Sequence, residues 1–169
     1  MDNPSIKYGL YTGIILIVVD LILVLISDKA YLYASAWIAT PFIIGSMVMA
    51  SKDYKTANEG YASFGEIFKA SWLTYLVTGL MTSIFGYVLF KFIAPSLTET
   101  SIQMAGEAME KMKGFIGEEG YEKAMESMEK NDPMGAFNQL TGLLSKYVMA
   151  AIPALVIGLV MKNQRNDFA

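Results

Sequence analysis

The chain has 169 residues, of which 54% are hydrophobic and only 17% are charged, and its mean hydropathy is +0.39. Soluble domains carry about 25% charged residues, so this composition predicts a single helical membrane domain. The absence of Cys and His excludes disulfides, Cys/His zinc sites and catalysis by thiol or imidazole, and a net charge of −3 gives no basic surface for nucleic acid.

The first apolar segment covers residues 8–27 and contains one acid, Asp20. Roughly 20 helical residues reach about 30 Å, the thickness of the hydrocarbon core, so we predict a first membrane span here. A cleaved signal peptide is the alternative, because residues 34–36 (Ala-Ser-Ala) resemble a cleavage site. The apolar stretch is too long for a signal peptide, however, and Asp28-Lys29 interrupts it. We interpret Asp28-Lys29 as a tight polar turn.

The second span is predicted over residues 30–51, which contain no charged residue. Pro41 lies inside this span and frees the carbonyl of Trp37, so we expect a kink whose free carbonyl neighbouring helices can satisfy. The polar residues within 51–60 then predict a loop on the opposite side of the membrane from the first turn.

A capping box predicts where the third membrane helix begins. Ser63 precedes Glu66 by three residues, the spacing at which each side chain satisfies the other residue's backbone N–H. The segment from residue 70 to residue 90 is uncharged, so the third span is predicted over residues 68–92.

The composition changes over about residues 95–135, which we interpret as an extramembrane acidic helical hairpin. Between residues 95 and 132, nine acids face four lysines. Gly114, Gly117 and Gly120 interrupt a helical pattern, so we expect a hairpin or a bent helix. The apolar residues that repeat at spacings of three and four, as on one face of an amphipathic helix, are Ile102, Ala105, Met109, Met112 and Ile116.

The last span is predicted over residues 143–161, which is short unless Lys146 extends to the interface. Asp132-Pro133 is typical of a helix start, so one helix is expected to rise from there into the membrane. More basic residues lie near the span ends on the side of the termini than on the other side, which predicts cytoplasmic termini. The two sets are Lys7, Lys52, Lys55, Lys69, Lys162 and Arg165 against Lys29, Lys91 and Lys146.

Two stretches of the chain, together with its four-span layout, resemble a known family. They are residues 60–69 (GYASFGEIFK) and residues 87–95 (YVLFKFIAP). Both are similar to the bacterial membrane family called domain of unknown function 4199 (DUF4199), and the likeness covers most of the chain. The resemblance implies a small bacterial inner-membrane protein with an acidic segment between the last two spans. It implies no established activity and no catalytic residues.

The sharpest functional signal is the acid inside the first span, because a buried carboxylate is costly in a bilayer and is expected to face a partner inside the bundle. Counting along the helices puts this acid at the depth of the hydroxyl groups of the third span, so we expect Thr78, Thr82 or the carbonyl of Trp37 to bond it. A structural hydrogen bond is the favoured interpretation, and a proton or ion path is the alternative. The candidate intramembrane polar cluster comprises Asp20, Thr40, Thr74, Thr78, Thr82 and Ser83.

Small residues in two spans allow close helix approach, at Gly9-x-x-x-Gly13 and Ala154-x-x-x-Gly158. We expect this packing within the bundle, with self-association through the first pair as the alternative. The methionines of the acidic segment are soft ligands that would suit Cu(I), but their place on an apolar face favours the core of the hairpin or a flexible partner surface. The candidate partner surface comprises Met109, Met112, Met125 and Met128.

We therefore expect an all-α, four-transmembrane-helix bundle that acts as a non-enzymatic structural or accessory protein of the bacterial inner membrane. Its expected partners are the lipid bilayer and a membrane protein or a second copy, without nucleic acid and without a cofactor. The alternative is a small proton- or ion-coupled transporter or channel that uses Asp20 and the Ser/Thr stripe of the third span. An intramembrane hydrolase would need a pair of intramembrane Asp residues, and the sequence offers one.

Overall fold

The computed structural model describes residues 3–130 and 136–163, except for the side chains of residues 127–130 and 136–140. All the elements it contains are helices, which confirms the predicted all-α class. In chain order they are α1 (Pro4–Ile26), α2 (Asp28–Ala57), α3 (Phe64–Val88), the short π-helix η1 (Leu89–Ile93), α4 (Ser96–Lys130) and α5 (Ala136–Met161).

Four helical segments are long and apolar enough to cross a membrane, and each overlaps one of the predicted spans. They are Pro4–Ile26, Asp28–Ala57, Phe64–Ile93 and Thr141–Met161. The third combines α3 with η1, and the fourth is the apolar part of α5. The chain thus has the composition and the helix lengths of a four-span membrane protein.

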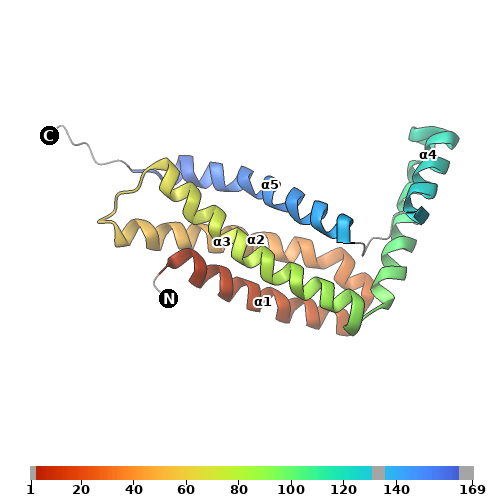
Figure 1. Cartoon of the computed structure of the whole chain (residues 1–169), viewed down its shortest axis with the longest axis horizontal. Helices are drawn as coiled ribbons and strands as arrows, with labels where there is room; N and C mark the ends of the chain where they lie inside the picture. The colour runs from red at the N-terminus through yellow and green to blue at the C-terminus, as the bar shows by residue number, and fades with distance from the viewer. Residues whose placement is uncertain (1–2, 131–135, 164–169) are drawn as a thin grey trace.

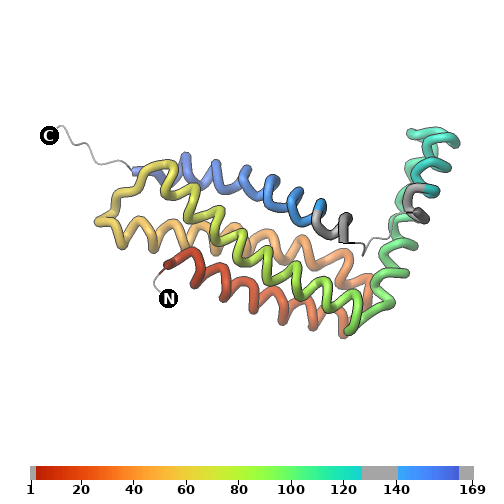
Figure 2. The backbone as a smooth tube through the Cα atoms, viewed as in Figure 1, coloured from red at the N-terminus to blue at the C-terminus, as the bar shows by residue number. Residues whose placement is uncertain are grey.

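The α3 helix occupies the centre of the bundle. It packs against α1, α2 and α5, whereas α1 packs against α2 and α3. Figure 1 shows these four helices running alongside one another, with the start of α1 and the end of α5 at the same end of the bundle. Figure 2 shows the same path as a tube, in which α4 leaves from the opposite end and projects across it. Among the described elements, α4 contacts α2 and η1.

A single residue, Ser27, connects α1 to α2. Its extended backbone ends α1, and its side chain caps α2 by accepting a hydrogen bond from the N–H of Ala30 at 3.0 Å. Asp28 and Lys29 therefore form the first turn of α2, so the turn predicted at these two residues was placed one residue too late. The helix gains from this arrangement, because an acid in the first turn interacts favourably with the helix dipole.

The α2 helix is longer than the predicted span and ends at Ala57. It continues through Pro41, and most of the loop predicted over 51–60 is helical instead. The polar residues there belong to a helix because other helices hold them, as Lys55 shows by donating to the carbonyl of Met161 on α5 at 3.1 Å.

The link between α2 and α3 turns at Glu59 and Gly60, whose φ angles are 56° and 84°. The predicted capping box at the start of α3 is confirmed. The backbone N–H of Ser63 donates to the carboxylate of Glu66 at 2.8 Å, and the Ser63 hydroxyl accepts from the N–H of Glu66 at 3.4 Å. These two bonds satisfy backbone donors that a helix start leaves free.

The α3 helix ends in a π-helical turn that the apolar periodicity does not predict. The N–H of Ala94 donates to the carbonyl of Leu89, five residues earlier, at 2.8 Å. Leu89, Ala94 and Leu97 then form a small buried cluster at the end of the bundle. This cluster fixes the start of α4 to the membrane-spanning helices.

The α4 helix is interrupted at one of its glycines. Gly117 has a φ of 73° and a ψ of 172°, a conformation that glycine adopts without a Cβ penalty. The helix therefore consists of two arms, residues 96–116 and 118–130, that meet at a bend. Lys113 and Glu118 form an ion pair across the bend at 2.8 Å.

Candidate functional site

The four candidate membrane-spanning helices bury several polar residues and expose many large apolar ones. Exposed apolar side chains lie on all four, such as Leu25 at 86%, Trp37 at 83%, Ile84 at 59% and Val160 at 77%. Apolar side chains such as Leu16, Met47 and Ile67 are buried as well, so it is the large exposed apolar surface that differs from a soluble protein and matches a bundle whose outer surface meets lipid. Among the described residues, the buried polar ones are Ser5, Thr12, Asp20, Ser46, Ser51, Ser71, Thr74 and Thr78.

Asp20 lies on α1 and is 9% exposed. Its carboxylate accepts a hydrogen bond from the hydroxyl of Ser35 on α2 at 2.7 Å. The expectation that Thr78, Thr82 or the carbonyl of Trp37 would bond this acid was therefore wrong. Because α1 runs six residues beyond Asp20, the acid lies about 9 Å from the end of α1, in the half of the bundle nearer α4.

The threonines of α3 satisfy their hydroxyl groups on backbone carbonyls. Thr74 donates to Ala70 at 2.8 Å, and Thr78 donates both to Thr74 at 3.0 Å and to Gly9 on α1 at 3.1 Å. Thr82 donates to the carbonyl of Thr78 at 3.1 Å. A hydroxyl in a helix commonly bonds the carbonyl four residues back, which is why the predicted stripe of hydroxyl groups does not turn toward Asp20.

The other two members of the predicted cluster are also separate from the acid. Thr40 donates to the carbonyl of Ala36 within α2 at 2.8 Å and is exposed. Ser83 lies on α3 and is half-buried. The structure therefore pairs the acid with a residue outside the cluster, and it uses Thr78 to join α1 to α3.

A second buried polar contact joins α2 to α3. The hydroxyl oxygens of Ser51 and Ser71 lie 2.8 Å apart, both side chains are fully buried, and Ser51 also donates to the carbonyl of Met47. Sequence reasoning missed this pair, because a serine at the end of a span is as typical of a loop as of a helix contact.

The end of the bundle that holds the start of α1 is closed by polar contacts. Tyr8 on α1 donates to Asp53 on α2 at 2.9 Å. Ala62 and Asn163 form an antiparallel bridge with two hydrogen bonds of 2.9 Å, which joins the start of α3 to the end of α5. Polar contacts therefore join α1 to α2 and α3 to α5 at this end, and the bond from Lys55 to Met161 joins α2 to α5.

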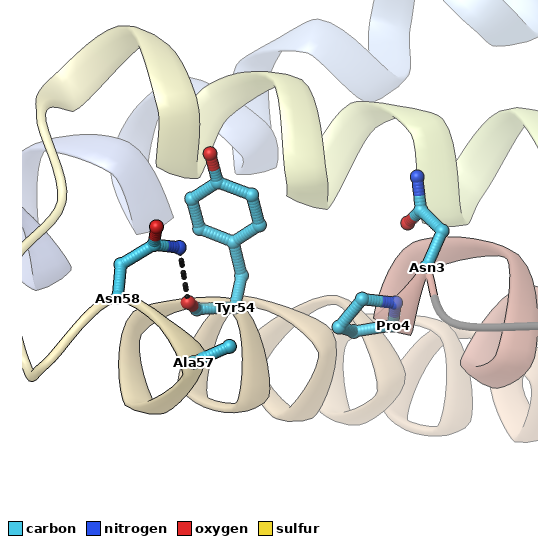
Figure 3. Close-up of a pocket in the computed structure, with 5 residues that line it drawn as sticks. All are labelled: Asn3, Pro4, Tyr54, Ala57 and Asn58. Atoms are coloured by element: carbon cyan, nitrogen blue, oxygen red, sulfur yellow. Dashed lines mark hydrogen bonds between the residues drawn. The ribbon is translucent and has the colours of Figure 1, made fainter.

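A small open cavity of about 310 Å³ lies at this same end. Figure 3 shows its lining residues, in which Asn58 donates its amide to the carbonyl of Tyr54 at 2.8 Å. Asn3 caps α1 by accepting from the N–H of Ser5. The polar side chains of the cavity thus make structural bonds. The lining residues are Asn3, Pro4, Tyr54, Ala57 and Asn58.

The predicted helix-packing residues lie at contacts within the chain. A Cβ added to Gly9 would lie 2.7 Å from the Cβ of Val77, and one added to Gly13 would lie 2.7 Å from the sulfur of Met81, both on α3. On α5, Ala154 is fully buried, and a Cβ at Gly158 would lie 3.0 Å from the ring of Phe64. Both pairs of small residues therefore let a neighbouring helix approach closely. 

The methionines of the predicted partner surface on α4 differ in how exposed their side chains are. Met109 and Met125 are half-buried, whereas Met112 is 49% exposed. The side chain of Met128 and the predicted helix start at Asp132-Pro133 lie outside the described residues. Within the part of the chain that the structure describes, no three acids are grouped so that they could hold a metal ion.

The comparison with known protein families finds a match that covers nearly the whole chain. The family model described as "Protein of unknown function (DUF4199)" matches residues 7–163. No curated protein and no solved structure matches the chain. The family match begins in the first turn of α1 and ends just after α5, so it includes every helix described above. The chain therefore belongs to the DUF4199 family.

Proposed function

We propose that this protein is a non-enzymatic structural or accessory protein of the bacterial inner membrane, with cytoplasmic termini and an extramembrane, acidic α4 hairpin. One observation carries the proposal. Three buried polar side chains of the bundle, Asp20, Ser51 and Thr78, bond a neighbouring helix, whereas α4 is fixed at its base and exposes many of its described side chains beyond it.

The interior contacts support a structural role for the bundle. Thr78 joins α3 to the backbone of α1, and Asp20 joins α1 to Ser35 of α2. The contact of Ser51 with Ser71 joins α2 to α3. Inter-helix hydrogen bonds of this kind contribute about 0.6 kcal/mol on average in membrane proteins. Three of them help to hold α1, α2 and α3 in place, which is a structural role and not a catalytic one.

The base of α4 supports its role as a presented element. Leu97 is fully buried against the end of the bundle, and Thr100 donates to the carboxylate of Asp28 at 3.2 Å. Beyond this base the helix exposes apolar side chains such as Ile102 and Met112 among its acids. An anchored helix with a mixed apolar and acidic surface suits contact with another membrane protein or a second copy.

The basic residues support the orientation. Lysines cluster at the end of the bundle that carries the start of α1 and the end of α5, and such a bias is typical of the cytoplasmic side. The described members are Lys7, Lys52, Lys55, Lys69 and Lys162, and Arg165 lies outside the described residues. With this end in the cytoplasm, α4 lies on the far side of the membrane.

Photo-crosslinking in intact cells tests the accessory role. A crosslinking amino acid at Gln103, which is exposed on α4, should give one discrete protein adduct, whether to a second copy or to another membrane protein. The matched control is Ile14, which is 54% exposed on the lipid-facing side of α1 and should give none. Loss of the Gln103 adduct in a Met109→Glu, Met112→Glu variant would assign it to the methionine surface. An absence of any adduct from α4 at normal protein levels would contradict the proposal.

A second candidate, a small proton- or ion-coupled transporter, is favoured by the enclosed carboxylate of Asp20. Its path would run between α1 and α2, where Ser35 bonds the acid, instead of along the threonines of α3. Purified protein in proteoliposomes would then carry a proton or ion flux that Asp20→Asn abolishes while the protein folds normally. Identical flux in protein-free vesicles would exclude this candidate.

A further inference from the structure

We propose that the first arm of α4, residues 96–116, lies along the membrane surface and inserts Phe115 among the lipid headgroups. The ligand of this surface is the lipid bilayer itself. The inference depends on the bundle spanning the membrane, and it holds on whichever side of the membrane α4 lies, so it is independent of the proposed accessory role.

The direction of the arm is set at its base. Leu97 packs on Leu89 and Ala94 at the end of the bundle, with Val24 of α1 and Leu32 of α2 against the same cluster. One turn later, Thr100 bonds Asp28 at the start of α2. The side of α4 that carries these residues therefore faces the end of the bundle.

Phe115 lies on this same side of the helix. It follows Leu97 by 18 residues, which is five turns of an α-helix, so the two side chains leave the helix in the same direction about 27 Å apart. The arm stays helical over this distance, since the backbone departs from helical geometry only at Gly117. Phe115 is 93% exposed, the largest exposure among the large apolar side chains described.

The position that Phe115 reaches is the boundary of the bilayer. Charged residues at Asp28, Lys29 and Lys91 mark the end of the bundle where the apolar spans stop. Figure 1 shows α4 crossing this end instead of continuing the bundle axis. Packed helices lie about 10 Å apart, so an arm of about 27 Å extends past its neighbours to a point above lipid.

The residue types on this side suit a lipid interface. Between Leu97 and Phe115 it carries Met104, Ala108 and Lys111, which combine apolar contact with a cation for lipid phosphate. Glu99 and Glu110 lie on the opposite side of the helix and point away from the membrane. Moving the aromatic ring of Phe115 from water into the headgroup region lowers its free energy, because apolar surface leaves water.

Site-directed fluorescence tests the inference, because the chain has no native Cys. The full-length variant Phe115→Cys carries an environment-sensitive label and is reconstituted into vesicles of phosphatidylethanolamine and phosphatidylglycerol. The matched control is Glu110→Cys, which lies on the same arm but on its opposite side. Both positions are exposed, so neither label should disturb the fold.

The label at position 115 should emit at shorter wavelength than the label at position 110, and lipids with a shallow nitroxide should quench it about twofold more strongly. A water-soluble quencher should show the reverse order. Equal quenching at the two positions would overturn the inference. Shielding of position 115 that disappears when the protein is diluted in lipid would also overturn it, because the surface would then be covered by a second copy.

Discussion

Replacing Gly9 by alanine should loosen the contact between α1 and α3. An added Cβ would lie 2.7 Å from the Cβ of Val77 and 3.0 Å from the carbonyl oxygen of Thr74. Carbon atoms in contact lie about 3.5–4.0 Å apart, so α1 would have to move away by about 1 Å. The same movement would stretch the 3.1 Å bond from Thr78 to the carbonyl of Gly9.

The expected loss of unfolding free energy combines two costs and one gain. Overpacking a close contact costs about 1–3 kcal/mol and a weakened hydrogen bond about 1 kcal/mol, offset by up to about 1 kcal/mol from the better helix propensity of alanine. We therefore expect Gly9→Ala to lower the free energy of unfolding by about 1–3 kcal/mol. Gly13→Ala should cost less, because its nearest contact is the flexible side chain of Met81.

The control variant is Gly45→Ala on α2, where an added Cβ would meet no atom within 4 Å. It should be neutral or slightly stabilising, because only helix propensity changes. The measurement is the free energy of unfolding from a reversible titration of detergent micelles with a denaturing detergent. If Gly9→Ala unfolds at the same fraction of denaturing detergent as Gly45→Ala, α1 and α3 are not packed closely enough at Gly9 for an added Cβ to collide with Val77.

Three further predictions concern the acid, the topology and the bend of α4. Asp20→Asn keeps an acceptor for Ser35 and should cost on the order of 1 kcal/mol in unfolding free energy, whereas Asp20→Leu should cost more; equal stability of both variants would show that the 2.7 Å bond contributes nothing. A Cys at Asn58 should be shielded from a membrane-impermeant thiol reagent in intact cells while a Cys at Glu118 is labelled, and the opposite pattern would invert the proposed orientation. Lys113 holds the pKa of Glu118 below its ordinary value through a hydrogen bond, so their contact persists at neutral pH and is lost as the pH falls through that lowered pKa. In an NMR titration, Lys113→Met should return the pKa of Glu118 to its ordinary range; an unchanged pKa would refute the pairing.

The length and apolarity of the spans made the membrane fold predictable from the sequence. The start of α3 was also predictable, because the capping box of Ser63 and Glu66 depends on two residues at a fixed spacing. The end of α2 was not predictable from the sequence. Charged residues after a span fit a loop or an exposed helical turn equally well, and the choice depends on distant partners such as Tyr8 and Met161.

The partner of Asp20 could not be derived by counting depth from the start of α1. That count assumed a helix from residue 8, whereas α1 begins at Pro4, and it compared α1 with α3. The relevant neighbour is α2, because the connection through Ser27 is one residue long and folds α2 back at once. Asp20 and Ser35 lie seven and eight residues from Ser27, so an antiparallel pair with this turn brings them to the same height.

Close helix contacts and polar groups occur together in this bundle. In lipid, apolar side chains gain little by turning inward, so helices associate through small residues that allow close approach and through hydrogen bonds. Gly9 provides both, because the lack of a side chain lets α3 approach and exposes a carbonyl that Thr78 reaches at 3.1 Å. A larger residue at position 9 would remove the close approach and the hydrogen bond together. The packing contact and the polar contact therefore belong to the same part of the α1–α3 interface. The losses of unfolding free energy caused by a variant at Gly9 and by a variant at Thr78 should not add up in the double variant.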